Sequence, residues 1–248
     1  ANSSVAVFSL KNVKLWSPES PFLYDVVYQV LDRDGTVVDE VVSYVGMRKV
    51  HIEGNRIYLN NEPCYQRLVL DQGFYPDGIW TAPSDEALKN DIELSLAAGF
   101  NGARLHQKAF EERFYYWADK LGYITWGEAP SWGMDANSVE VARNFLQEWS
   151  ELVLRDRNHP SIFMWSIGNE VLEQWTDAKA DTLSLEEANL VLNFGRSADM
   201  LAKDGEMSVN SLLTKKLADM VRKLDATRPV TAGCNEPNPN NHLFRSGA

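Results

Sequence analysis

The stretch that decides the fold has the sequence DRNHPSIFMWSIGNE and extends from Asp156 to Glu170. Residues 162–167 within it are apolar except for one serine, which predicts a buried strand. The strand is followed by Asn169 and Glu170. In sheets of parallel strands the chemistry lies at the carboxyl ends of the strands, so we expect this carboxyl and this amide at the mouth of such a sheet.

Short apolar runs alternate with helical patterns on both sides of this stretch. The predicted strands are 67–70, 102–105, 123–126, 162–167 and 229–232. One helical pattern begins at Ser84 and stops at Gly99, a second includes Phe110 and stops at Gly122, and a third starts near Asn137. Two further helical stretches cover roughly 185–203 and 209–225. Strands that alternate with one-sided helices predict βαβ units and a parallel sheet.

Residues 1–52 have a different pattern, with four strand-like runs and no helix. The runs are 5–10, 22–31, 36–44 and 47–52, and Asp34-Gly35 predicts a hairpin between the second and third. A complete β-sandwich needs about seven strands, so this part is expected to be an incomplete sandwich.

Composition excludes several classes of partner. The net charge of −11 argues against nucleic acid and against anionic membranes, since both need clustered Lys and Arg. No apolar run approaches the ~20 residues that span a bilayer. Cys64 and Cys234 are interpreted as two separate buried thiols, with a disulfide as the alternative.

Glu170 suits the chemistry of glycosidic bond cleavage. That reaction needs one protonated carboxyl, which gives its proton to the leaving oxygen, and one ionised carboxylate that acts as nucleophile or base. Glu170 fits the donor, and Asn169 fits a hydrogen bond to a sugar hydroxyl. The alternative for a lone Asn-Glu pair is a helix cap or a surface position.

The whole stretch 156–170 closely resembles the acid/base signature of glycoside hydrolase family two, which contains β-galactosidases, β-glucuronidases and β-mannosidases. Four further stretches are similar to family patterns: Leu15–Glu19, Tyr44–Val50, Ile57–Pro63 and Asp225–Val230. The resemblance implies an immunoglobulin-like β-sandwich fragment over 1–52. It also implies that 53–248 forms an incomplete (β/α)8 TIM barrel with about five of its eight βα units.

One signature departs from the family. The usual pattern is Asn-x-x-Arg-x-Ser-His-Tyr-Pro, whereas this chain has NGARLHQK from Asn101 to Lys108. The resemblance implies that Arg104 supports the catalytic carboxylates. Because a shift of one residue on a strand turns a side chain to the other face, His106 is either a binding residue or a buried structural imidazole, and Gln107 is the alternative occupant of the pocket.

Residues at three further strand ends are candidates for binding sugar hydroxyls: Asp71 with Gln72, Glu128, and Asn235 with Glu236. The alternative for each is a supporting or loop position. Trp80, Trp126 and Trp132 could stack on a sugar ring, although large aromatic residues are more often part of the core.

The resemblance therefore implies a retaining glycoside hydrolase that acts on terminal β-galactosides, with β-glucuronidase or β-mannosidase as alternatives and a non-catalytic carbohydrate-binding or scaffold protein as the rival class. Its nucleophile would lie on a seventh strand outside these 248 residues, so the chain alone is expected to be inactive. Some family members bind Mg²⁺ or Na⁺, but no ligands can be assigned here. Homo-oligomerisation of a longer parent is left open, as is the location of a bacterial-type enzyme in the cytoplasm, in the periplasm or outside the cell.

Overall fold

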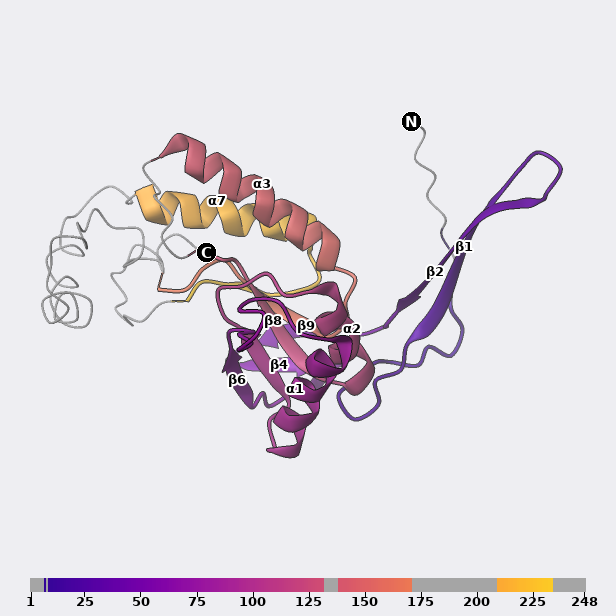
Figure 1. Ribbon diagram of the computed structural model, residues 1–248, viewed down its shortest axis with the longest axis horizontal. Coiled ribbons are helices and arrows are strands. Elements are labelled where there is room, and N and C mark those ends of the chain that lie inside the picture. Colours follow the sequence, from indigo (N-terminus) through magenta and orange to yellow (C-terminus); the bar gives the residue numbers. More distant parts are fainter. Residues whose placement is uncertain (1–6, 8, 132–137, 171–208, 234–248) are drawn as a thin grey trace, which may run out of the picture.

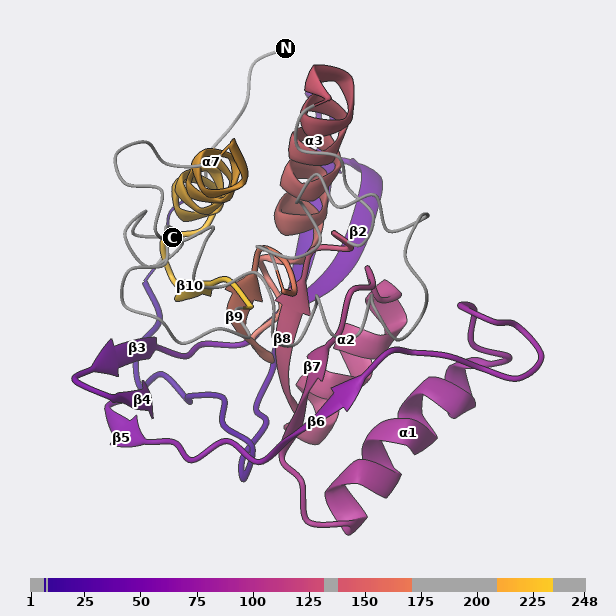
Figure 2. The ribbon, with the colours of Figure 1, turned by 90° about the vertical axis from the view of Figure 1, so that its left-hand side faces the viewer.

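The computed structural model describes residues 7, 9–131, 138–170 and 209–233. Five parallel strands form the main sheet in the order β10-β9-β8-β7-β6 (Figure 2). Their bounds are β6 (Leu68–Asp71), β7 (Gly102–Leu105), β8 (Ile124–Glu128), β9 (Ile162–Ser166) and β10 (Val230–Thr231). Strands that are consecutive in the chain are neighbours in space, as in a (β/α) barrel. The prediction of five parallel strands is confirmed.

The helices of the described part are α1 (Asp85–Ala97), α2 (Glu112–Leu121), α3 (Val139–Asp156) and α7 (Val209–Leu224). The Ser84 side chain accepts a hydrogen bond from the Ala87 amide and caps α1, and Gly122, at φ 74°, ends α2. Helix α1 packs on α2, and α3 packs on α7 (Figure 1). The helical pattern over 185–203 lies outside the described residues.

The strands β1 (Tyr24–Leu31) and β2 (Val37–Val45) form an antiparallel hairpin that extends away from the main sheet (Figure 1). Asp32 Oδ1 accepts hydrogen bonds from the amides of Asp34 and Thr36, both at 2.9 Å, within the turn. The hairpin predicted at Asp34-Gly35 is confirmed. Residues 7, 9 and 10 of the run predicted at 5–10 are not in a strand, and its other residues lie outside the described part.

A second small sheet joins β3 (Val50–Glu53), β4 (Arg56–Leu59) and β5 (Glu62–Pro63). The strand predicted at 47–52 therefore pairs with β4 and not with the β1–β2 hairpin. The reason is burial, because Val50 and Leu59 face each other in register and pack with Trp16, Ile124 and Phe163. This small sheet lies against the starts of β8 and β9.

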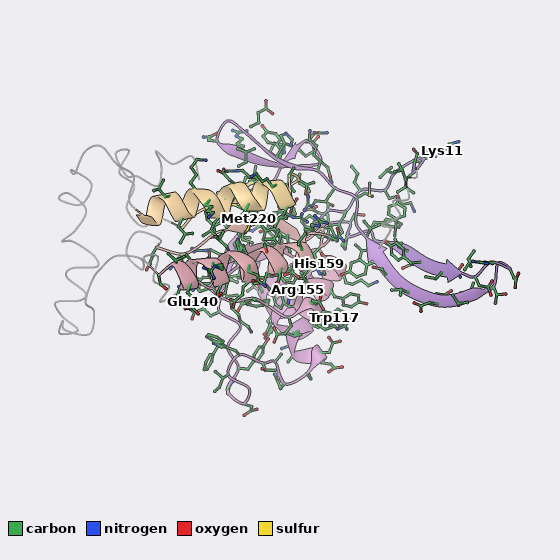
Figure 3. All side chains as sticks on the ribbon, turned by 90° about the horizontal axis from the view of Figure 1, so that it is seen from above. Lys11, Trp117, Glu140, Arg155, His159 and Met220 are labelled. Carbon is green, nitrogen blue, oxygen red and sulfur yellow. The ribbon has the colours of Figure 1, made fainter. Side chains whose placement is uncertain are left out.

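A polar cluster at the amino ends of the strands binds the N-terminal segment to the sheet. The buried Asp119 carboxylate accepts hydrogen bonds from Tyr44 Oη at 2.8 Å, His159 Nδ1 at 2.6 Å and the Ser161 amide at 2.9 Å. Burial, together with the Asp119 charge, raises the pKa of Tyr44. We call these four residues the Asp119 network, and Figure 3 shows His159 near the end of α3 that faces the β1–β2 hairpin.

Candidate active site

A cavity of about 780 Å³ opens at the carboxyl ends of the parallel strands. Its described lining residues come from the ends of β6 and β7 and from the segments that follow β6, β7, β8 and β9: Leu70, Gln72, Phe74, Trp80, Arg104, His106, Gln107, Lys108, Pro130, Asn169 and Glu170. The cavity therefore lies at the edge of the sheet where the strand pattern predicted the chemistry.

Glu170 and Asn169 lie next to each other at this cavity. The segment that leads to them is held in place because Gly168 O accepts a hydrogen bond from the Gly233 amide at 2.8 Å, just after β10. Asn169 is buried, whereas Glu170 is half-buried with a φ of 46°. This left-handed conformation is strained for a residue with a side chain, and such strain collects at functional sites.

Arg104 of β7 lines the cavity and connects β8 to the segment that follows β9. Its Nε donates to Glu128 Oε2 at 2.6 Å, and its Nη2 donates to Asn169 Oδ1 at 2.7 Å. Glu128 is the last residue of β8, where it lies opposite Ser166 of β9, and does not follow the strand as the sequence predicted. Its side chain is fully buried and does not line the cavity.

His106 and Gln107 both line the cavity, so the expectation that only one of them could face it is wrong. The alternation of a strand no longer applies, because β7 ends at Leu105 and Gln107 has a φ of 54°. Gln72 Nε2 lies 3.0 Å from His106 Nδ1, and Gln107 Nε2 lies 3.2 Å from His106 Nε2. A neutral imidazole has one donor and one acceptor, so in that state one glutamine must present its oxygen.

The remaining candidates lie in different places. Asp71 ends β6, but its Oδ1 accepts from the Gly73 amide at 2.8 Å and it does not line the cavity. Burial raises the pKa of Asp71, although the hydrogen bond from Gly73 opposes that rise. Its neighbour Gln72 lines the cavity instead. Asn235 and Glu236 lie outside the described residues.

The three candidate tryptophans also separate. Trp80 lines the cavity and is largely exposed. Trp126 donates from its ring nitrogen to Gln66 Oε1 at 2.7 Å and does not line the cavity. Trp132 lies outside the described residues. Of the three, only Trp80 is seen at a place where it could stack on a ligand ring.

Lys108 is a cavity-lining residue that the sequence did not reveal. Its Nζ donates to Gly73 O at 2.9 Å and lies 3.6 Å from Glu111 Oε2. It belongs to the stretch that departs from the family pattern, so no motif marked it. Phe74, another unexpected member, could have been suspected as a large aromatic residue in the loop after β6.

The described residues contain no group of three or more His, Cys, Asp and Glu side chains placed to hold a metal ion. Within the same ranges, none of the helices is both long and apolar enough to cross a bilayer.

A parallel barrel sheet with a carboxyl and an amide at its carboxyl edge is the arrangement of a barrel enzyme. Residues 1–48 match the family model of glycosyl hydrolases family 2, and residues 50–242 match the model of the TIM barrel domain of that family. The chain belongs to glycosyl hydrolase family 2. These matches confirm the resemblance found in the sequence. They also confirm that the chain is glycosyl hydrolase sequence.

Relatives support the same assignment. Beta-galactosidase BoGH2A of Bacteroides ovatus is 46% identical over 252 residues, which cover 96% of this chain and 29% of that protein. A beta-galactosidase of Lactococcus lactis is 34% identical over 172 residues, covering 66% of this chain and 17% of that protein. The chain thus spans less than a third of the length of these relatives.

Solved structures agree with the fold. A beta-glucuronidase of Bacteroides uniformis superposes with a TM-score of 0.74 at 23% identity, covering 94% of this chain and 26% of that one. The five-stranded sheet is therefore part of a TIM barrel.

Proposed function

We propose that this chain contributes the acid/base half of a retaining β-glycosidase active site, with Glu170 as the proton donor and then the base. The observation that carries the proposal is the position of Glu170, beside Asn169 at a cavity of about 780 Å³ at the carboxyl edge of the sheet. A partly buried carboxyl at such a site can hand a proton to the leaving oxygen of a sugar bound in the cavity.

The second carboxylate of the retaining mechanism is a separate part of the proposal. Among the described residues that line the cavity, Glu170 is the only carboxylate. A retaining pair has its carboxyl groups ~5 Å apart on opposite sides of the scissile bond. We therefore assign the nucleophile to a segment outside the described residues.

A terminal β-galactoside is the proposed substrate. The two strong cations among the described lining residues already have carboxylate partners, since Arg104 pairs with Glu128 and Lys108 lies near Glu111. A uronic acid needs an uncompensated cation for its carboxylate, so the described lining favours a neutral sugar over a glucuronide. The B. ovatus relative, at 46% identity, is a beta-galactosidase by name.

The domain organisation is also proposed. We infer that the β1–β2 hairpin belongs to an immunoglobulin-like β-sandwich and that the barrel domain begins near residue 50. The β3–β5 sheet supports this position, because β3 pairs with β4 and packs against the barrel strands. Predicted boundaries of 1–52 and 53–248 would divide that small sheet.

The test uses the full-length protein with aryl β-galactosides whose leaving groups differ in pKa. A Glu170→Gln variant should lose about 10²- to 10⁴-fold in kcat/KM on substrates with poor leaving groups. The loss should be much smaller on activated leaving groups, which do not need a proton. The control is Glu148→Gln, which changes an exposed glutamate of α3 and should leave the kinetics unchanged.

Several outcomes would overturn the proposal. Equal losses on poor and activated leaving groups would remove Glu170 from the acid/base role. Hydrolysis of β-glucuronides or β-mannosides in preference to β-galactosides would replace the substrate. Sugar binding without hydrolysis of any β-glycoside would favour a non-catalytic carbohydrate-binding protein.

A further inference from the structure

The Glu128 carboxylate has no direct access to the cavity, yet both of its oxygens hold groups that line it. Oε2 accepts a hydrogen bond from Arg104 Nε at 2.6 Å, and Oε1 accepts one from the backbone N–H of Gln107 at 3.0 Å. The side chain is fully buried. Because Glu128 does not line the cavity, it is not placed to bind a sugar hydroxyl, which its strand-end position had suggested.

In the first contact, Glu128 binds Arg104, and Arg104 in turn binds the side-chain amide of Asn169, the residue before Glu170. A guanidinium has only donors, so the Asn169 atom 2.7 Å from Arg104 Nη2 must be the amide oxygen. This fixes the orientation of the amide, and the Asn169 NH₂ group is left as the hydrogen donor of that side chain. Glu128 in turn fixes the guanidinium plane by binding its Nε.

The second contact holds the turn that follows β7. Gln107 has a φ of 54°, which costs a non-glycine residue of order 1–3 kcal/mol and persists only where the surroundings hold it. The Glu128 carboxylate binds the amide of this residue. The turn brings both His106 and Gln107 to the cavity, as their common place in its lining shows.

We propose that Glu128 is a positioning residue, which sets the direction of the Asn169 amide and the shape of the His106–Gln107 turn without touching the substrate. The role rests on the proposed function, because it concerns the same cavity. We call Glu128, Arg104, Asn169 and Gln107 the Glu128 network.

The test is Glu128→Gln in the full-length protein. The new amide would place a donor opposite either Arg104 Nε or the Gln107 N–H, so one of the two contacts must be lost. Since a displacement of about 1 Å can cost ~10²-fold in rate, we expect kcat/KM per folded protein to fall by about 30- to 100-fold. Wild-type kcat/KM in the folded variant would overturn the role.

A double-variant cycle separates positioning from mere loss of folded protein. If part of the effect of Glu128 passes through Asn169, the fold loss that Glu128→Gln causes should be smaller in the Asn169→Ala background than in the wild-type background. Losses that multiply would contradict the proposal, because a purely structural defect reduces the activity of any background by the same factor.

Asp156→Asn is the matched control. Asp156 is buried and paired with the part-exposed Arg155 at 2.6 Å, as Glu128 is with Arg104, but it is the last residue of α3, precedes the amino end of β9 and does not line the cavity. This variant should lose stability and keep its kcat/KM within about threefold. A loss as large as that of E128Q would show that any broken buried ion pair lowers the activity.

Two further measurements keep the inference testable. If E128Q does not fold, Glu128→Asp keeps the charge but is too short for both contacts, and about a tenfold loss of kcat/KM is expected.

Binding of a non-hydrolysable β-thiogalactoside does not need turnover, and its Kd should rise about tenfold in either variant. Wild-type protein that binds this ligand without hydrolysing substrates contradicts the proposed function alone, whereas unchanged kcat/KM and Kd in the variants contradict the positioning role alone. Wild-type protein that shows neither binding nor hydrolysis contradicts both.

Discussion

Each end of the parallel sheet contains a buried carboxylate, and the two carboxylates have different roles. At the amino ends, the Asp119 network buries a carboxylate among Tyr44, His159 and the Ser161 amide. At the carboxyl ends, the Glu128 network buries a carboxylate between Arg104 and the Gln107 amide. Both carboxylates are fully buried and both accept hydrogen bonds from more than one element.

The difference lies in what borders each network. The Asp119 network is in contact with packed residues, because Trp16 donates to the Asp119 backbone oxygen at 2.8 Å and is itself fully buried. The Glu128 network borders a cavity of about 780 Å³, which Arg104, Asn169 and Gln107 line. A buried carboxylate therefore stabilises the N-terminal segment at one end and orients ligand-facing groups at the other. Substitutions at the first end should change stability, and those at the second should change turnover.

The largest effect that this comparison predicts is that of a substitution at Asp119. An Asp119→Asn variant would place a donor among three donors in a buried site, so we expect it to lower the free energy of unfolding by about 3 kcal/mol. Its kcat/KM per folded protein should stay near the wild-type value. Urea denaturation measures the first quantity, and Glu148→Gln, at an exposed position of α3, is the control without a measurable change. A kinetic defect as large as the stability defect would erase the distinction between the two ends.

The next largest effect is expected from a substitution of Gly233, at the carboxyl ends of the strands. A Cβ built there would lie 2.9 Å from Gly168 O and 3.1 Å from Arg104 Nη2, so the Arg104–Asn169 contact must move. We expect Gly233→Ala to lower kcat/KM by about tenfold. Gly54→Ala is the opposite control, since its Cβ meets nothing within 4 Å but its φ is +60°; it should lower stability and leave kcat/KM unchanged. The reverse pattern in the two variants would refute the prediction.

The smallest effect concerns Tyr44 and pH. A Tyr44→Phe variant loses one hydrogen bond to Asp119, which leaves two in place, so about 1 kcal/mol of stability should disappear at neutral pH. Burial and Asp119 raise the pKa of Tyr44 in the folded state. The unfolded chain then releases this proton first, near pH 10, and the stability that depends on it is lost as pH rises further.

The wild-type protein should therefore lose more stability than Tyr44→Phe between about pH 9 and pH 11. Thermal unfolding of both proteins across this range measures the difference. Because other groups titrate equally in the two proteins, their contributions cancel. Parallel curves would show that Tyr44 does not contribute.

The sequence anticipated much of the fold and part of the site. The strand-and-helix alternation predicted the five parallel strands, and the end of the stretch 156–170 placed Asn169 and Glu170 at the cavity. Arg104 was also marked by its motif. The pairing of β3 with β4, in contrast, was not predicted, because a strand-like run shows that a segment is extended but does not show its neighbour.

The sequence by itself determined the family, the parallel sheet and the residues at the ends of its strands, since local patterns of apolar residues and long motifs carry that information. Only the tertiary structure decided which of those residues line the cavity and which support the lining from behind. Glu128 lies behind the cavity and Gln107 at it, because the first is on a buried strand and the second is in a left-handed turn. Which buried carboxylate stabilises the fold and which orients ligand-facing groups depends on whether a cavity borders it, and that is settled only when distant segments pack together.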